Sequence, residues 1–249
     1  SAEGQELVRA LATDCDVLIE NYKAGSLAKY GLDYASLSQL NPRLVYCSVT
    51  GFGQTGPRAA EPGYDFIIQG IGGLMSITGE RDDLPGGGPQ KVGVAFSDLM
   101  TGLYSTVAIQ AALLSREKSG VGQYIDMALL DVQVATLCNQ SQNYLSSGKA
   151  PGRYGNAHAN IVPYQVFEVA PKPDGGKDFI ILAVGNDGQY AKFCQVAGRP
   201  ELASDPRYVK NADRVRHRAE LVPLLEPLMK SRSKTDWLRT LEAAKVPCG

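Results

Sequence analysis

Two short apolar segments near the start of the chain limit its fold more than any other feature. Residues 15–21 (CDVLIEN) and 43–53 (RLVYCSVTGFG) have the composition of buried strands, and helical segments lie before and between them. Strands that are joined through helices pair in parallel, which indicates a Rossmann-like layer. The sequence therefore predicts an α/β fold with a parallel sheet in the first third of the chain.

The carboxyl ends of these two strands are where we expect a ligand. Open parallel sheets bind ligands at that edge, and the ends here are residues 21–22 and 50–53. No GxGxxG or P-loop motif follows either strand, so the usual dinucleotide and nucleoside triphosphate signals are absent. Lys23, Lys29 and Tyr30 lie between the strands and could meet the phosphates and ring of a nucleotide-like ligand. The alternative is a solvated loop with ordinary surface lysines.

Asp98 is the strongest candidate for chemistry because it stands before a long stretch without charge. Residues 99–115 are uncharged and carry apolar side chains on nearly all faces of a predicted helix, which indicates a buried helix. Burial raises the pKa of a carboxyl, whereas the free N–H groups and the positive dipole end of a helix lower it. A carboxylate kept ionised in such a place is a candidate nucleophile. The alternative is that Asp98, or Ser97 before it, only caps the helix.

Composition and charge exclude several classes of function. The net charge of −1 provides no basic field for nucleic acid or a membrane surface. The helix after Asp98 is too short and too often interrupted by polar residues to span a bilayer, and no secretory signal is visible. The chain has only 2 histidines, which argues against a His-rich metal site. Its 5 cysteines form no CxxC pair and indicate reduced thiols in a cytosol-like compartment.

The last third of the chain predicts a small α+β domain. Residues 162–170 and 178–185 flank the turn KPDGGK and predict a β-hairpin. Helices are predicted to follow at 188–198, 211–231 and 234–244. The basic residues of the second of these helices are interpreted as a solvated face, with an anion site as the alternative: Arg214, Arg216, His217 and Arg218. Trp237 is interpreted as a core residue.

The chain is predicted to have three parts and to be truncated at both ends. The parts are an incomplete large Rossmann-like domain with the Asp98 helix (1–115), a helical linker (116–159) and the small α+β domain (160–249). The sequence has no initiator methionine, opens inside a predicted helix and stops at a Pro-Cys-Gly turn. We therefore expect elements of the large domain to lie outside it.

A series of segments, in order over essentially the whole chain, carries a resemblance to a known family. They are DVLIENYKAGSLAKYGLDY, NPRLVYCSVTGFGQTGP, PGYDFIIQGIGGLMSITG, GVAFSDLMTGLY, GQYIDMALLD, AHANIVPYQVF, DPRY and VPCG. Together they resemble the class III CoA-transferases, the CaiB/BaiF group. The resemblance implies that the protein moves CoA from an acyl-CoA to a free carboxylic acid without a metal. It also implies a large and a small domain and an interlocked homodimer, and the reduced cysteines predict a cytoplasmic location.

The resemblance also assigns roles to individual residues. The family's catalytic aspartate opens a helix in an Asp-x-x-x-Gly segment, which here is Asp98 followed by Gly102. The implied mechanism passes through an aspartyl anhydride and an aspartyl-CoA thioester on that residue. His158 resembles a position at the acyl end of the site, with a structural histidine as the alternative. The residues that match the segment lining coenzyme A are Asn21, Tyr22, Lys29 and Tyr30.

Tyr64 matches a position beside the catalytic aspartate and bears on the reaction type. The racemase branch of the family has a proton-moving histidine there, whereas a tyrosine, with an unperturbed pKa of about 10, is a poor base. A tyrosine can still donate a hydrogen bond to a thioester or anhydride oxygen. The sequence thus favours CoA transfer, with an α-methylacyl-CoA racemase-like enzyme or an inactive CoA-binding fragment as the alternatives.

The substrate is expected to be a dicarboxylate. A glycine run that forms a mobile loop in oxalate-type members is not evident near residues 163–184, which argues against oxalate. The residues of these segments resemble more closely the branch of the family that handles succinate and glutarate derivatives.

Overall fold

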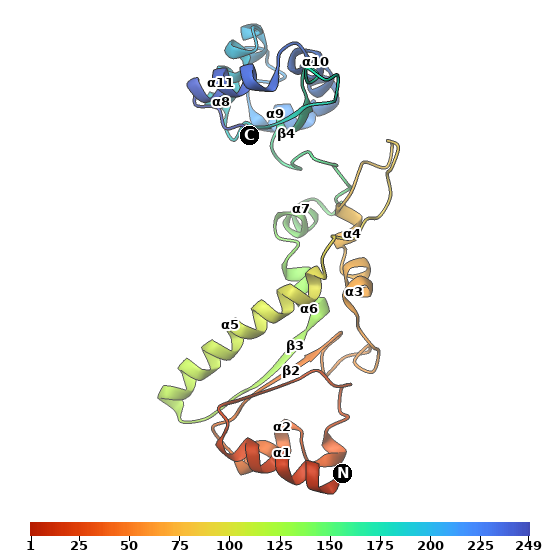
Figure 1. The fold of residues 1–249 in the computed structure, drawn as a ribbon, viewed down its shortest axis with the longest axis vertical. Helices are drawn as coiled ribbons and strands as arrows, with labels where there is room; N and C mark the ends of the chain where they lie inside the picture. Colours follow the sequence, from red (N-terminus) through yellow and green to blue (C-terminus); the bar gives the residue numbers. More distant parts are fainter. The chain divides into compact units, whose positions relative to one another are not determined.

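The computed structural model describes residues 1–249, which form two compact units, Ser1–Arg153 and Tyr154–Gly249 (Figure 1). This division differs from the predicted one. Residues 116–153 belong to the first unit rather than to a helical linker, because a third strand in this stretch pairs with the sheet of that unit. None of the helices combines the length and the apolar character that crossing a bilayer requires.

The first unit is built on a parallel sheet, as the sequence predicted. Its strands are β1 (Val17–Glu20), β2 (Val45–Thr50) and β3 (Tyr124–Ala128), in the order β1-β2-β3. Both pairs are parallel, and Ile19, Cys47 and Ile125 stand side by side across the sheet. All three strands therefore end at one edge, where parallel sheets bind ligands.

Two helices support the start of this sheet. They are α1 (Ala2–Asp14), which the Ser1 hydroxyl caps, and α2 (Tyr34–Leu40). They pack through a small core of buried side chains: Ala12, Leu37, Leu44 and Tyr46. Of the helical segments predicted between the two strands, the first is only a single 3-10 turn, Ala28–Tyr30, which ends at Gly31 with a φ of 65°. A left-handed backbone of this kind suits glycine and stops the turn.

The remaining helices of this unit are α3 (Asp65–Ile71), α4 (Leu74–Ile77), α5 (Phe96–Ser119), α6 (Leu129–Ala135) and α7 (Asn139–Ser147). The long helix α5 packs against β2 and β3 and contacts α3 and α6 (Figure 1). At its far end the buried Arg116 donates to the Arg43 carbonyl oxygen and to the Asp16 carboxylate, 2.9 and 2.7 Å away. These contacts fix the helix along the sheet.

The prediction that α5 is buried was wrong about its faces. Its fully buried residues are mostly small or polar: Ser97, Thr101, Ser105, Ala112 and Arg116. Several of its large apolar residues are instead exposed: the exposed fractions of Leu103, Val107 and Leu114 are 61%, 67% and 70%. Small side chains let a helix approach a sheet closely, so this face packs against the sheet although it is the less apolar one.

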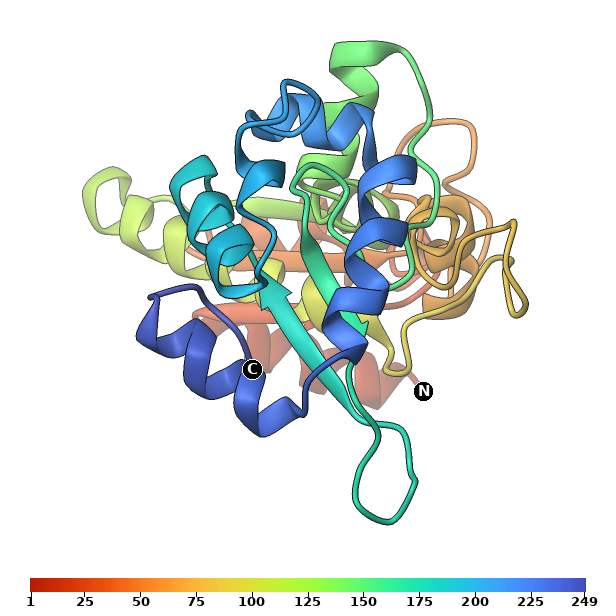
Figure 2. The same cartoon turned by 90° about the horizontal axis from the view of Figure 1, so that it is seen from above.

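The second unit contains the predicted β-hairpin. Strands β4 (Tyr164–Glu168) and β5 (Phe179–Ala183) are antiparallel, with Phe167 opposite Ile180, and Figure 2 shows the projecting loop that joins them. The predicted helix at 211–231 is broken at His217. The helical elements that cover the hairpin are α8 (Asp187–Val196), the 3-10 turn Pro200–Ala203, α9 (Asn211–Arg216), α10 (Arg218–Lys230) and α11 (Lys234–Ala243). Trp237 is fully buried in the core, as predicted.

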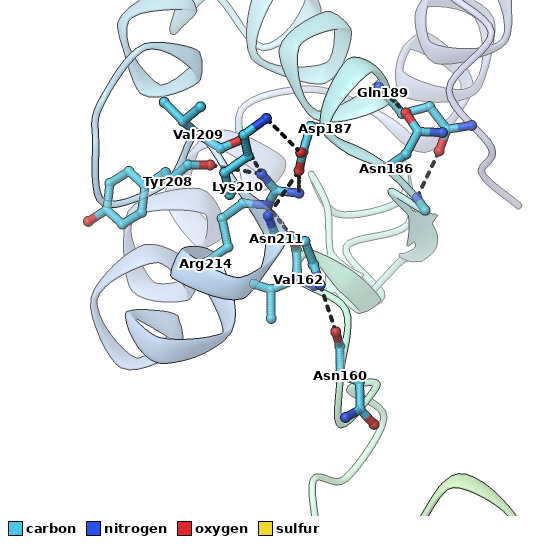
Figure 3. A network of polar contacts seen from close by, with 11 residues as sticks. Asn160, Val162, Asn186, Asp187, Gln189, Tyr208, Val209, Lys210, Asn211 and Arg214 are labelled. Atoms are coloured by element: carbon cyan, nitrogen blue, oxygen red, sulfur yellow. Dashed lines mark hydrogen bonds and ion pairs between the residues drawn. The ribbon is translucent and has the colours of Figure 1, made fainter. Parts of the chain in front are cut away.

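The prediction of a solvated basic face was wrong for Arg214. Its side chain is fully buried and donates to the carbonyl oxygens of Val162 and Tyr208, 2.7 and 2.8 Å away (Figure 3). It also forms an ion pair of 2.9 Å with Asp187. Burial alone would raise the pKa of Asp187, but the hydrogen bond and charge of Arg214 outweigh it and hold that pKa below its ordinary value.

Candidate active site

A cavity of about 840 Å³ opens at the edge where the three strands of the first unit end. This volume falls in the range of small-molecule and cofactor sites. Its walls come from the segments that follow β1 and β2, from the start of α3 and from one face of α5. The cavity brings together four of the predicted site residues: Asn21, Tyr22, Tyr64 and Asp98.

The α5 wall of the cavity follows from helical periodicity. Residues three, four, seven and eight positions after Asp98 share its face of the helix. These residues are small, which leaves room beside the carboxylate: Thr101, Gly102, Ser105 and Thr106. These four residues were not among the predicted site residues, although counting in steps of three and four from Asp98 identifies them.

Neither Asp98 nor Ser97 caps α5, so that alternative for Asp98 is set aside by the structure. The N-cap position is Ala95, which has no side-chain cap, and the amide of Ser97 donates instead to the Asp65 carboxylate, 2.8 Å away. The Asp98 side chain is therefore free to face the cavity. Asp98 is in the first turn of the helix, where the helix dipole favours a negative charge.

Asp98 is the one carboxylate on the cavity wall whose oxygens have no hydrogen-bond donor in the structure. The others are engaged: Glu20 accepts from the Tyr22 amide at 2.8 Å, and Glu61 pairs with an arginine at 2.6 Å. Asp65 accepts from Ser97 and from a glutamine. Partial burial, and then the charge of Asp65, raise the pKa of Asp98 above its ordinary value. A carboxylate with a raised pKa and no partner is a better nucleophile than a paired one.

Tyr64 reaches the cavity through a close contact between two backbone segments. It is the N-cap residue of α3, and its side chain is 69% exposed. The preceding Gly63 packs against Gly51, which follows β2, so closely that a Cβ atom on either glycine would overlap the backbone of the other. This contact ties the start of α3 to the end of the sheet.

Two of the predicted CoA-binding residues do not line the cavity. Lys29 and Tyr30 are in the 3-10 turn, where the Lys29 ammonium lies 4.7 Å from the Tyr30 ring centre. The Tyr30 carbonyl oxygen accepts from Arg9 at 2.9 Å. Lys23 does line the cavity and is the one basic residue that does so. It follows β1 by three positions, which is the signal that could have separated it from Lys29.

His158 belongs to the second unit. Its Nδ1 accepts from the Asn160 amide at 3.0 Å, and its ring lies 5.3 Å from that of Tyr164. No group of three or more His, Cys, Asp or Glu side chains is arranged to hold a metal ion.

Comparisons with known proteins agree on one family. The chain matches the description of CoA-transferase family III over residues 1–249. It is 54% identical to the succinate–glutarate CoA-transferase of Agrobacterium fabrum, covering 99% of this chain and 59% of that protein. It is 40% identical to the human succinyl-CoA:glutarate CoA-transferase, covering 99% of this chain and 54% of that protein. The chain thus spans little more than half the length of these relatives.

Solved structures give the same result. A CaiB/BaiF family protein from Brucella suis is 53% identical and superposes with a TM-score of 0.77, covering 100% of this chain and 63% of that one. Rv3272 from Mycobacterium tuberculosis, at 27% identity, has a TM-score of 0.83 with the same coverage of both chains. Sequence and fold together show that the chain belongs to CoA-transferase family III.

Proposed function

We propose that the cavity beside Asp98 is the active site of a CoA-transferase that moves CoA from an acyl-CoA to a free dicarboxylic acid. The observation that carries the proposal is the unpartnered Asp98 carboxylate on the cavity wall, in a chain of CoA-transferase family III. Relatives at 54% and 40% identity are named for succinate and glutarate, which supports dicarboxylates as the acids exchanged.

In the first half of the proposed reaction, a carboxylate oxygen of Asp98 attacks the thioester carbonyl of the acyl-CoA. The carbon–sulfur bond breaks, leaving a mixed anhydride on Asp98 and a CoA thiolate. The thiolate then attacks the aspartyl carbonyl of the anhydride. This forms an aspartyl-CoA thioester and releases the donor acid, which carries away one oxygen atom of Asp98.

The second half runs the same two steps with the acceptor acid. Its carboxylate attacks the aspartyl thioester and forms a second mixed anhydride while the CoA thiolate leaves. The thiolate attacks the acceptor's carbonyl, which gives the new acyl-CoA and restores Asp98 with one oxygen from the acceptor. No net proton is consumed, and the two acids exchange CoA without loss of activation to water as long as water is excluded.

Tyr64 is assigned to catalysis together with Asp98, and the other residues of the site are assigned to binding. Tyr64 lines the cavity, and its hydroxyl is proposed to donate to a thioester or anhydride oxygen. Asn21 and Tyr22 line the cavity and are assigned to the pantetheine arm, and Lys23 supplies a positive charge for an anionic group. Lys29 and Tyr30, outside the cavity, are assigned to the nucleotide end of coenzyme A.

The family resemblance leads us to extend the proposal beyond the cavity. His158 is assigned to the acyl end of the site. The working enzyme is proposed to be a cytoplasmic, interlocked homodimer. Sedimentation of the purified protein tests the assembly, and cell fractionation tests the compartment.

Oxygen transfer into Asp98 tests the mechanism directly. The protein is incubated with succinyl-CoA and with glutarate labelled with 18O in its carboxylates, digested, and examined by peptide mass spectrometry. The peptide containing Asp98 should gain one 18O atom as glutaryl-CoA forms. Label in another aspartate, or transfer without label in Asp98, would reject the proposed nucleophile.

Substitution at Asp98 gives the matching kinetic test. Asp98→Ala should reduce transfer by at least about 10³-fold, because no other carboxylate on the wall is free to form the anhydride. Asp131→Ala is the control, since Asp131 is an exposed carboxylate in the first turn of α6. Transfer carried out in heavy water should leave the α-proton of a 2-methylacyl-CoA in place; rapid deuterium uptake there would favour the racemase alternative.

A further inference from the structure

We propose that Asp65 is a positioning residue for Asp98, held in place by the buried Gln69, and that Gln133 fixes the same turn of α5 from α6. This inference rests on the proposed function of Asp98 as the nucleophile. It concerns residues on α3 and α6 that do not themselves react.

Asp65 caps α5 from another helix. Its Oδ1 atom accepts a hydrogen bond from the Ser97 amide at 2.8 Å and lies 3.4 Å from the Asp98 amide. Both amides are in the first turn of α5, where backbone N–H groups have no partner within the helix. A carboxylate at this place accepts hydrogen bonds from these N–H groups and interacts favourably with the positive end of the helix dipole. The backbone that carries Asp98 is thus held by a side chain 33 positions earlier in the sequence.

Gln69 determines where the Asp65 carboxylate points. Its side chain is fully buried, and its amide group donates to Asp65 Oδ2 at 2.8 Å. Its carbonyl oxygen accepts from the Val92 amide at 2.9 Å, and its amide group also lies 3.3 Å from the Val94 carbonyl oxygen. Gln69 therefore ties Asp65 to the segment at 92–94 that leads into α5. A buried polar side chain with all these partners has one favourable orientation.

Gln133 holds the same turn of α5 from α6. Its side-chain carbonyl oxygen accepts from the Ser97 hydroxyl at 2.6 Å, and both side chains are fully buried. Gly72 makes room for it, because a Cβ atom at that position would overlap the Gln133 side chain. The Thr101 hydroxyl completes the arrangement by donating to the Ser97 carbonyl oxygen at 2.7 Å. Ser97 is therefore bonded at its amide, hydroxyl and carbonyl, and Asp98 is the next residue.

This arrangement does two things for Asp98. It fixes the turn that carries the carboxylate without using the carboxylate itself, and it places a second negative charge close by. The ionisable groups on the surrounding elements are Tyr64 and Asp65 at the start of α3, Asp131 on α6, Glu20 at the end of β1, and Lys23 and Glu61 in the loops. Among them Asp65 acts on the Asp98 pKa, raising it together with burial. A more basic carboxylate attacks a thioester more readily.

The test compares Asp65→Asn, Asp65→Ala and the control Asp131→Asn in the whole chain. The Asp98 carboxyl is titrated by 13C NMR with labelled aspartate, and transfer from succinyl-CoA to glutarate is measured from acidic to neutral pH. Asp65→Asn should lower the pH at which Asp98 titrates and move the acid limb of kcat/KM in the same direction. Asp65→Ala should reduce kcat by about 10²-fold with a much smaller change in KM, because the nucleophile is displaced rather than removed. Asp131→Asn should change neither.

An unchanged Asp98 titration in Asp65→Asn would overturn the proposal, as would wild-type kcat in Asp65→Ala. The near-isosteric Asp65→Asn, read by titration, decides the matter if Asp65→Ala does not fold. Asp98→Ala is measured in parallel to separate the two proposals. If Asp98→Ala keeps full activity, the proposed function fails, whereas the titration still shows whether Asp65 controls the Asp98 carboxyl.

Discussion

Asp98 and Asp187 occupy similar places in the two units and have opposite surroundings. Each is in the first turn of a helix, α5 in the first unit and α8 in the second. Asp187 is bonded to Arg214, to Lys210 and to the Asn211 amide, and its pKa is lowered (Figure 3). Asp98 has no partner for its carboxylate, and its pKa is raised. Whether an acidic residue at a helix start is structural or chemically available thus depends on whether other elements supply hydrogen-bond donors and positive charges to its carboxylate.

The same contrast extends to the helices around these two residues. In the second unit, the buried Arg214 guanidinium donates to two carbonyl oxygens and to the Asp187 carboxylate. The buried apolar side chains of this unit form one core cluster. In the first unit, α5 buries small polar residues and leaves Leu103, Val107 and Leu114 exposed. The second unit therefore pairs its buried arginine with an aspartate, whereas the first presents a cavity and an unpaired carboxylate.

The largest effect we expect is on the stability of the second unit, from Arg214→Ala, which removes the hydrogen bonds and the ion pair of the Arg214 guanidinium. It leaves the carbonyl oxygens of Val162 and Tyr208 without a donor and opens a buried space, and should destabilise this unit by about 3–5 kcal/mol. Trp237 is the single tryptophan and lies in this core, so its fluorescence in a urea titration reports the change. Arg216→Ala is the control, because the Arg216 side chain is 70% exposed and should cost less than about 1 kcal/mol. Equal midpoints for the two variants would contradict a structural role for Arg214.

A smaller effect is expected in the first unit from Gly51→Ala. The new Cβ atom would overlap the Gly63 backbone and push the start of α3 away from the sheet, which should cost about 1–3 kcal/mol. Because Tyr64 follows Gly63, transfer should also slow by about 10²-fold. Gly93→Ala is the control, since a Cβ atom there meets nothing within 4 Å.

Two further measurements test the effect of Gly51→Ala on the stability of each unit. Hydrogen exchange of the β2 amides should become faster, while the Trp237 unfolding midpoint should stay at the wild-type value, since Trp237 lies in the other unit. A wild-type rate of transfer in Gly51→Ala would show that the contact between the two glycines does not hold Tyr64 at the site.

The sequence predicted those features that depend on nearby residues. The parallel pairing of the first two strands followed from apolar segments joined by helices, and the β4–β5 hairpin followed from the turn at 172–177. The features it missed depend on residues far apart in the chain. Arg214 meets Val162 and Asp187, 52 and 27 positions away, so its local pattern is that of a solvated helix.

The candidate site shows the same limit. Asp98 was identified from the lack of other charges after it, but its capping partner lies 33 positions earlier and has no local signal. The apolar content of α5 could not show which face packs on the sheet, because the helix carries apolar residues on nearly every side. Lys29 and Tyr30 are close in sequence to the end of β1, yet the turn at 28–30 leaves them off the cavity wall.

The smallest effect we expect is a difference in sign between Asp98→Asn and Asp187→Asn as pH changes. The folded-state pKa of Asp187 is depressed, so its charge stabilises the fold above the unfolded-state pKa of about 3.9 and this contribution is lost as pH falls through the folded value. The folded-state pKa of Asp98 is raised, so its contribution is present at low pH and is lost as pH rises through the folded value.

Asp187→Asn should therefore destabilise the second unit at pH 7 by up to about 1 kcal/mol, and the difference from wild type should shrink in acid. Asp98→Asn should slightly stabilise the first unit at pH 7, again with no difference in acid, as measured by Trp237 fluorescence for the second unit and by hydrogen exchange of α5 for the first. If both variants shifted stability in the same direction, the contrast between a paired and an unpaired aspartate would not describe this protein.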